Sequence, residues 1–144
     1  MDARFNYRET DARAAHGVQL VVLLYEQMIH DLRRAVQCLE RRDVEQRTRH
    51  INHALLVVSH LQCTLDLSVN APVTQNLAQF YHVLRQALVR AQATASRPIL
   101  EQQISVLLEI REAWAQATAA ATIPAQKQPS YGSEVRPEIT GWKG

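Results

Sequence analysis

Residues 18–39 read VQLVVLLYEQMIHDLRRAVQCL, and this stretch decides the fold class. Its apolar side chains return every three or four positions, which is the spacing of one face of an α-helix. No glycine or proline interrupts the stretch, and most of its polar residues are good helix formers. We predict a helix whose buried face consists of Val18, Val21, Leu24, Tyr25, Met28, Leu32, Ala35, Val36 and Leu39.

Glycine is scarce across most of the chain. Only 4 of the 144 residues are glycine, and none lies between Gly17 and Gly132. β-Sandwiches and barrels need turns that contain glycine, and nucleotide-binding α/β folds need glycine-rich phosphate loops. A chain that is 47% hydrophobic and lacks both features is predicted to be all-α.

Three more helical stripes follow the first. They cover residues 44–65, 73–91 and 100–117, and each repeats its apolar residues at three and four positions. Asp43 can cap the second helix, and Pro72 suits the first turn of the third. Because the links between the stripes are short, helices that are neighbours in sequence must run antiparallel. We therefore predict an antiparallel up-down four-helix bundle over residues 17–122.

The two ends of the chain differ from this bundle. Residues 1–16 are polar apart from Phe5 and Tyr7, so we expect a flexible N-terminal arm with an aromatic anchor and an entry turn at Gly17. Residues 123–144 hold 3 of the 5 prolines and 3 of the 4 glycines, and they show no apolar period. This composition predicts a disordered C-terminal tail.

Charge and hydropathy exclude several classes of function. The 16 Lys and Arg residues are balanced by 14 Asp and Glu residues and are spread along the chain, so we expect no nucleic-acid partner. The apolar run at residues 20–25 is too short to cross a bilayer, and the first residues are charged where a signal peptide is apolar. We expect a cytoplasmic protein without membrane insertion, in which Cys38 and Cys63 are reduced thiols.

The sequence offers no constellation for catalysis. No Glu is followed by His three residues later, so the di-iron motif of ferritin-like bundles is missing. His50 and His53 have no Cys or carboxylate at ligand spacing, and no GxSxG, HExxH or P-loop motif occurs. We expect no enzyme activity, no cofactor and no metal, with a bundle metalloenzyme as the least favoured alternative.

The first helix has more apolar residues than one stripe can bury. All six residues from Leu20 to Tyr25 are apolar, so the helix start is apolar all round and needs extra cover. Val57, Leu67 and Val83 are similar spare positions on later helices. The cover can be the N-terminal arm, a second copy or a foreign peptide in a groove; alternatively, these residues only widen the core.

Four motifs follow one another along residues 5–116. They are Tyr7-x12-Leu20-Val21-x2-Leu24-Tyr25-Glu26, Ile51-x2-Ala54-x3-Val58-x2-Leu61-x3-Leu65-Asp66, Asn76-Leu77-x2-Phe80-Tyr81-x3-Arg85-x2-Leu88-x2-Ala91 and Leu107-x2-Ile110-Arg111-Glu112-Ala113-Trp114. In this order they resemble the flagellar secretion chaperone family (FliS). The turn before the first helix, which carries Ser/Thr-Pro in that family, is His16-Gly17 here.

The resemblance implies a cytoplasmic export chaperone. Such a protein binds the C-terminal segment of flagellin, prevents premature polymerisation and delivers flagellin to a component of the flagellar type III export gate. We expect a monomer or weak homodimer. The alternative is a homo-oligomeric helical structural or adaptor bundle without a flagellin client. The residues expected to bind flagellin are Tyr7, Leu20, Leu24, Tyr25, Leu65, Asn76, Leu77, Phe80 and Tyr81.

Overall fold

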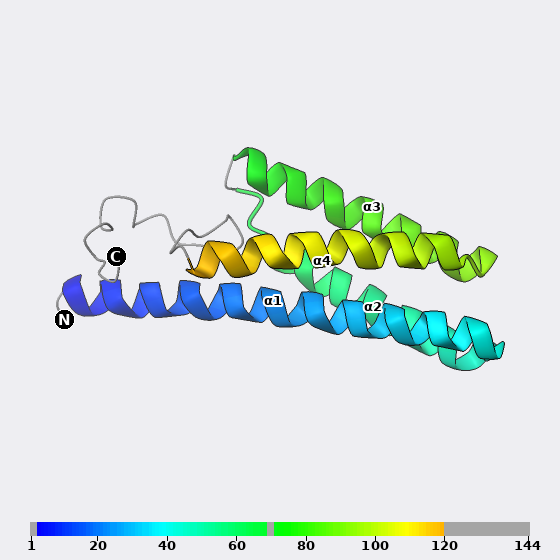
Figure 1. Ribbon diagram of the computed structural model, residues 1–144. Coiled ribbons are helices and arrows are strands. Elements are labelled where there is room, and N and C mark those ends of the chain that lie inside the picture. Colours follow the sequence, from blue (N-terminus) through cyan, green and yellow to red (C-terminus); the bar gives the residue numbers. More distant parts are fainter. Residues whose placement is uncertain (1–2, 69–70, 120–144) are drawn as a thin grey trace.

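The computed structural model describes the backbone of residues 3–68 and 71–119, with side chains described for residues 17–68 and 71–117. The described residues form four helices, arranged as in Figure 1, and contain no strand. The all-α class predicted from the sequence is therefore confirmed. The helices are α1 (Ala3–Arg41), α2 (Val44–Thr64), α3 (Pro72–Thr94) and α4 (Arg97–Ala119).

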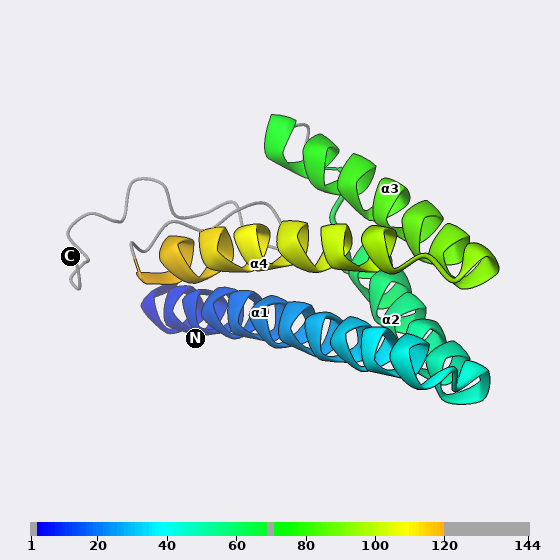
Figure 2. The same ribbon diagram turned by 45° about the vertical axis from the view of Figure 1, so that its right-hand side comes forward.

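The helices form an antiparallel up-down bundle, as the short links predict. Helices α1 and α3 each pack against α2 and α4, so α1 and α3 are diagonal to one another. Helix α1 packs more extensively against its two neighbours than α3 does against the same two. The start of α3 also diverges from α4 (Figures 1 and 2). Helix α3 is therefore the most loosely packed helix of the bundle.

The helix ends follow the local sequence. The Asp43 carboxylate accepts a hydrogen bond from the backbone N–H of Gln46 at 3.1 Å, which confirms Asp43 as the N-cap of α2. Pro72 stands in the first turn of α3, as predicted. In this glycine-poor chain, two other residues take the left-handed conformation: Arg42 after α1 (φ 59°) and Ala95 after α3 (φ 52°).

The core lies between the four helices and uses the predicted stripes. Most of the stripe residues of α1 are buried, and only the side-facing members are half-buried. Each of the other helices contributes a row at the expected spacing. The largest fully buried side chains of the core are Tyr25, Met28, Leu32, Ile51, Val58, Leu61, Thr74, Tyr81, Leu84, Leu88, Leu100 and Leu107.

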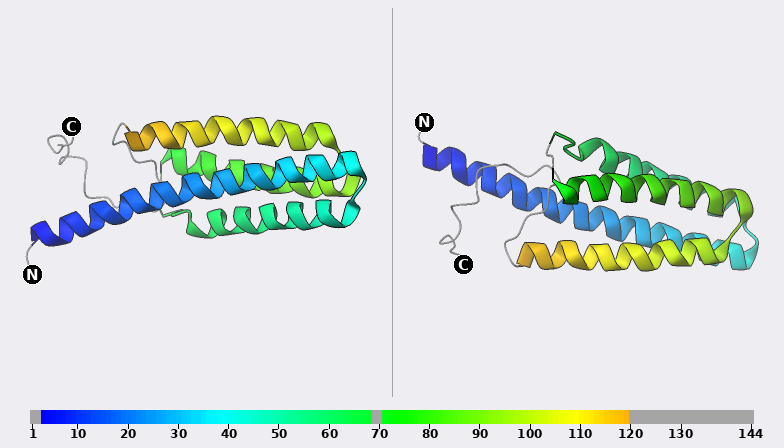
Figure 3. Two further views of the ribbon diagram at one scale, coloured as in Figure 1. Left: turned by 60° about the horizontal axis from the view of Figure 1, so that its bottom comes forward. Right: turned by 90° about the horizontal axis from the view of Figure 1, so that it is seen from above.

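The N-terminal segment differs from the expectation. Helix α1 begins at Ala3 and runs without a break through Gly17, so the expected entry turn is not present. Figure 3 shows that α1 extends beyond the ends of the other helices. Ala, Arg and Glu dominate residues 3–15 and all favour helix, and a single Gly destabilises a helix by only about 1 kcal/mol. The predicted tail, residues 123–144, lies outside the described residues.

Candidate partner-binding surfaces

Eight large apolar side chains are exposed on the described part of the bundle. The most exposed are Leu56 and Leu67, each 68% accessible, followed by Leu23 at 60%. Single exposed apolar residues are ordinary, but groups of them mark binding surfaces. A binding surface therefore requires that several of these side chains lie close to one another.

One group lies on the outer edge between α1 and α2. The Asp31 carboxylate and the Nδ1 atom of His53 are 2.5 Å apart, which sets these antiparallel helices in register. Residues before Asp31 therefore lie beside residues after His53. Leu20 is about three helical turns before Asp31, and Leu56 follows His53 by less than one turn. We call Leu20, Leu23 and Leu56 the leucine edge.

A second group lies on α3, the looser helix. Val73, Asn76, Phe80 and Val83 are spaced by three and four residues, so they share one helical face. Val73 and Val83 are 46% and 45% exposed, Asn76 is exposed, and Phe80 is half-buried with its ring centroid 5.6 Å from that of Tyr81. We call these four residues the α3 surface.

A hydrogen-bonded cluster lies beneath these surfaces. The hydroxyl groups of Tyr25 and Tyr81 are 2.9 Å apart, and both residues are fully buried. Burial raises the pKa of Tyr25 to about 12, although hydrogen bonds with Tyr81 and Trp114 oppose this shift. Because indole can only donate, Trp114 donates to the Tyr25 oxygen. The cluster joins α1, α3 and α4.

Ion pairs close the seam between α1 and α4. Arg111 of α4 pairs with Glu26 of α1 at 2.9 Å, and Arg97 pairs with Glu40 at 2.8 Å. Arg97 also pairs with Glu101, and these carboxylates raise the pKa of its guanidinium. Both α1–α4 pairs are partly exposed, so each adds little stability.

Comparison with known proteins assigns the chain to a protein family. The family described as "Flagellar protein FliS" matches residues 1–121 of the chain.

The chain belongs to the FliS family.

A curated relative from Bacillus subtilis (strain 168), named "Flagellar secretion chaperone FliS", is similar in sequence. It is 22% identical over 127 residues, which cover 88% of this chain and 90% of the relative. The family predicted from four sequence motifs is thus confirmed, and the FliS match spans the whole four-helix bundle.

The predicted flagellin-binding residues of this FliS family member do not all reach the surface. Leu20 and Asn76 are exposed, one on the leucine edge and one on the α3 surface. The half-buried residues are Leu24, Leu77 and Phe80, all packed against the core. The buried ones are Tyr25, Leu65 and Tyr81. The side chain of Tyr7 lies outside the described residues.

Part of the exposed apolar surface of this FliS bundle was predicted from the sequence. Leu20, Leu23, Leu67 and Val83 are exposed, as the spare positions suggested. Val57 is buried, so at this position the alternative holds: its spacing from Ala54 and Leu61 places it at the margin of the core, which it widens. Leu56 was missed. Its position two residues from both Ala54 and Val58 is the signal, because it points away from their stripe.

Among residues with described side chains, no three His, Cys, Asp or Glu residues come together as metal ligands. None of the described helices is both long and apolar enough to span a membrane.

Proposed function

We propose that this protein binds the C-terminal segment of flagellin in the cytoplasm, prevents its premature polymerisation and delivers it to the flagellar type III export gate. Family membership and the name of the Bacillus subtilis relative, a flagellar secretion chaperone, support a chaperone role. A chaperone role also supports the expectation that the chain is not an enzyme. The observation that carries the proposal is the leucine edge, a set of exposed leucines on a well-packed bundle.

The energetics suit a client that is disordered before binding. Such a segment loses conformational entropy when it becomes ordered, so it needs a broad apolar surface in compensation. Burying the exposed half of one leucine side chain is worth on the order of 1 kcal/mol. The three residues of the leucine edge thus offer about 3 kcal/mol, and the α3 surface adds to this.

The predicted binding residues divide into two roles under this proposal. The exposed and half-exposed ones contact the client directly: Leu20 and Leu24 on α1, and Asn76, Leu77 and Phe80 on α3. The buried residues Tyr25, Leu65 and Tyr81 act by holding the helices that carry those contacts. Tyr7 belongs to the N-terminal segment, and we propose that this segment contributes to contacts with the client and the export gate.

Calorimetry with a synthetic peptide of the flagellin C-terminal segment tests the proposal. We expect a 1:1 complex with a negative heat-capacity change, because apolar surface is buried. The double variant Leu23→Ser/Leu56→Ser should weaken binding about tenfold or more. The control is Val44→Ser/Val89→Ser, which alters two residues that are similarly exposed, at 57% and 53%, outside both surfaces.

Two results contradict the proposal. One is no detectable binding at roughly tens of micromolar peptide. The other is an equal loss of affinity in the serine variants and in their control. If the leucine edge is instead buried against a second copy, analytical ultracentrifugation will show a concentration-dependent dimer that the Leu23→Ser/Leu56→Ser variant abolishes. That outcome would favour the alternative of a homo-oligomeric structural bundle over a weakly dimerising chaperone.

A further inference from the structure

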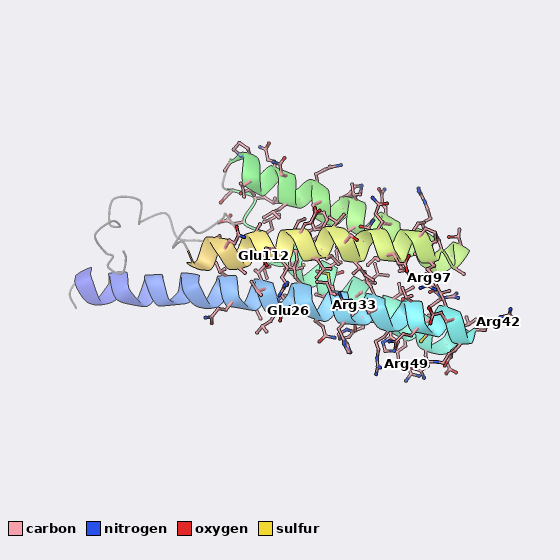
Figure 4. All side chains as sticks on the ribbon, viewed as in Figure 1. Glu26, Arg33, Arg42, Arg49, Arg97 and Glu112 are labelled. Carbon is pink, nitrogen blue, oxygen red and sulfur yellow. The ribbon has the colours of Figure 1, made fainter. Side chains whose placement is uncertain are left out.

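Arginines gather at the end of the bundle where α1 meets α2. Arg34 and Arg41 lie on α1, Arg42 forms the turn, and Arg49 lies on α2; all four are exposed. Figure 4 labels Arg42 and Arg49 at this end, whereas Glu26 and Glu112 lie toward the other. We call Arg34, Arg41, Arg42 and Arg49 the arginine surface.

These guanidinium groups are poorly neutralised. Among the described side chains, no carboxylate forms an ion pair with Arg34, Arg41 or Arg42. Arg41 contacts only the sulfur of Cys38, at 3.8 Å. Arg49 reaches Glu45 at 3.9 Å, and both side chains are mostly exposed, so this pair is weak.

The arginine surface continues the leucine edge along the same face. Arg34 follows Asp31 by three residues, and Arg49 precedes His53 by four. Because Asp31 and His53 are in contact, both arginines lie near the line along which α1 and α2 pack together. The leucines line this face on the other side of the Asp31–His53 pair. A partner lying along the face would therefore meet apolar side chains first and guanidinium groups next.

We propose that the arginine surface docks a carboxylate-rich segment of a partner protein. Arg presents a planar fork of donors that matches a carboxylate in two parallel hydrogen bonds. The local charge is modest, since Glu40, Asp43 and Glu45 stand among or beside the four arginines. That suits a short acidic stretch better than nucleic acid, whose backbone carries a dense row of phosphate charges. The adjoining leucine edge also favours a protein, because it offers apolar contacts to the same partner.

Fluorescence anisotropy with a defined probe tests this docking surface. The probe is a labelled, terminally blocked peptide with consecutive glutamates flanked by leucines, and its counterpart has glutamine in place of each glutamate. We expect the glutamate peptide to bind at least about tenfold more tightly at low salt. This preference should shrink as the salt concentration rises, because the exposed charges are screened.

A matched pair of variants locates the site. Arg34→Glu/Arg41→Glu reverses two members of the arginine surface, and Arg33→Glu/Arg90→Glu reverses two exposed arginines outside it. Both double variants change the net charge equally. The first should abolish the preference for glutamate, and the second should retain most of it. Circular dichroism of each variant checks that the bundle is intact.

Three outcomes overturn the inference. In the first, the glutamine peptide binds as tightly as the glutamate peptide. In the second, both double variants lose binding equally, which would show that only the net charge matters. Alternatively, a single-stranded oligonucleotide of the same charge can bind more tightly than the glutamate peptide, which would reassign the surface to nucleic acid. None of these measurements involves flagellin, so they can fail while the chaperone proposal stands.

Discussion

The hydroxyl oxygens of Tyr25 and Tyr81 lie 2.9 Å apart and link α1 to α3, the diagonal pair of helices whose backbones do not pack together. Their rings meet edge to face, with centroids 6.4 Å apart. Trp114 of α4 adds a hydrogen bond to the same Tyr25 oxygen. Since a diagonal contact constrains the rotation of both helices, this cluster fixes which face α3 presents to solvent.

Removing one hydroxyl should therefore weaken the bundle. Tyr81→Phe leaves a hydroxyl buried without this partner, and we expect a loss of about 1–2 kcal/mol in the free energy of unfolding, measured in urea. Tyr25→Phe should cost more, because it removes the hydrogen bonds with both Tyr81 and Trp114. The double variant should cost less than the sum of the single variants. Simple additivity would contradict a shared hydrogen bond.

Alkaline pH should destabilise the fold through Tyr25. Its pKa is raised from 10.0 to about 12 in the folded state, so above pH 10 the unfolded chain releases this proton and the folded chain keeps it. Stability should fall by up to about 1.4 kcal/mol per pH unit between these two values. Urea denaturation at several alkaline pH values measures this slope, and Tyr25→Phe serves as the control. An identical slope in that variant would contradict the assignment.

The Asp31–His53 contact should matter more than the surface ion pairs. Asp31 is only 4% exposed, and its carboxylate accepts hydrogen bonds from His53 and from the side chain of Gln27. In His53→Ala the buried Asp31 carboxylate keeps only the hydrogen bond from Gln27. We expect the free energy of unfolding to fall by about 1–3 kcal/mol at neutral pH. Arg49→Ala, which breaks only an exposed pair on the same helix, should change stability by less than about 0.5 kcal/mol.

Replacing Ala95 with glycine should stabilise the C-terminal end of α3. Ala95 has a φ of 52°, where a Cβ atom is unfavourable and glycine is not. Ala95→Gly is therefore expected to stabilise the protein by up to about 1 kcal/mol. Ala113→Gly is the matched control in the interior of α4, where glycine should cost about 1 kcal/mol. Thermal denaturation of both variants measures whether each substitution stabilises or destabilises the protein. A destabilised Ala95→Gly variant would contradict the strained cap.

The sequence predicts the architecture well because helical periodicity reports burial directly. Met28, Leu32 and Leu61 were placed in the core by spacing alone, and Asp43 and Pro72 marked the helix starts. The N-terminal boundary was not predictable in this way, since one glycine does not decide whether a helix continues.

The binding surface was harder to predict than the core. Helical spacing places Tyr25 on the buried face, but no local pattern shows that its hydroxyl partner is Tyr81, 56 residues away. The register that brings Leu56 to the same edge as Leu20 likewise depends on the contact between Asp31 and His53. Such pairings follow from the packing of whole helices and leave no local pattern.

The weaker packing of α3 has a consequence for how the molecule opens. Helices α2 and α4 can each stay packed on α1 while α3 detaches, since both pack more extensively against α1 than against α3. Amide hydrogen exchange should then show α3 exchanging as one cooperative unit, with less protection than α1. Native-state proteolysis should give its first cuts in α3 or its links. The protein would behave as a three-helix platform with a hinged fourth helix.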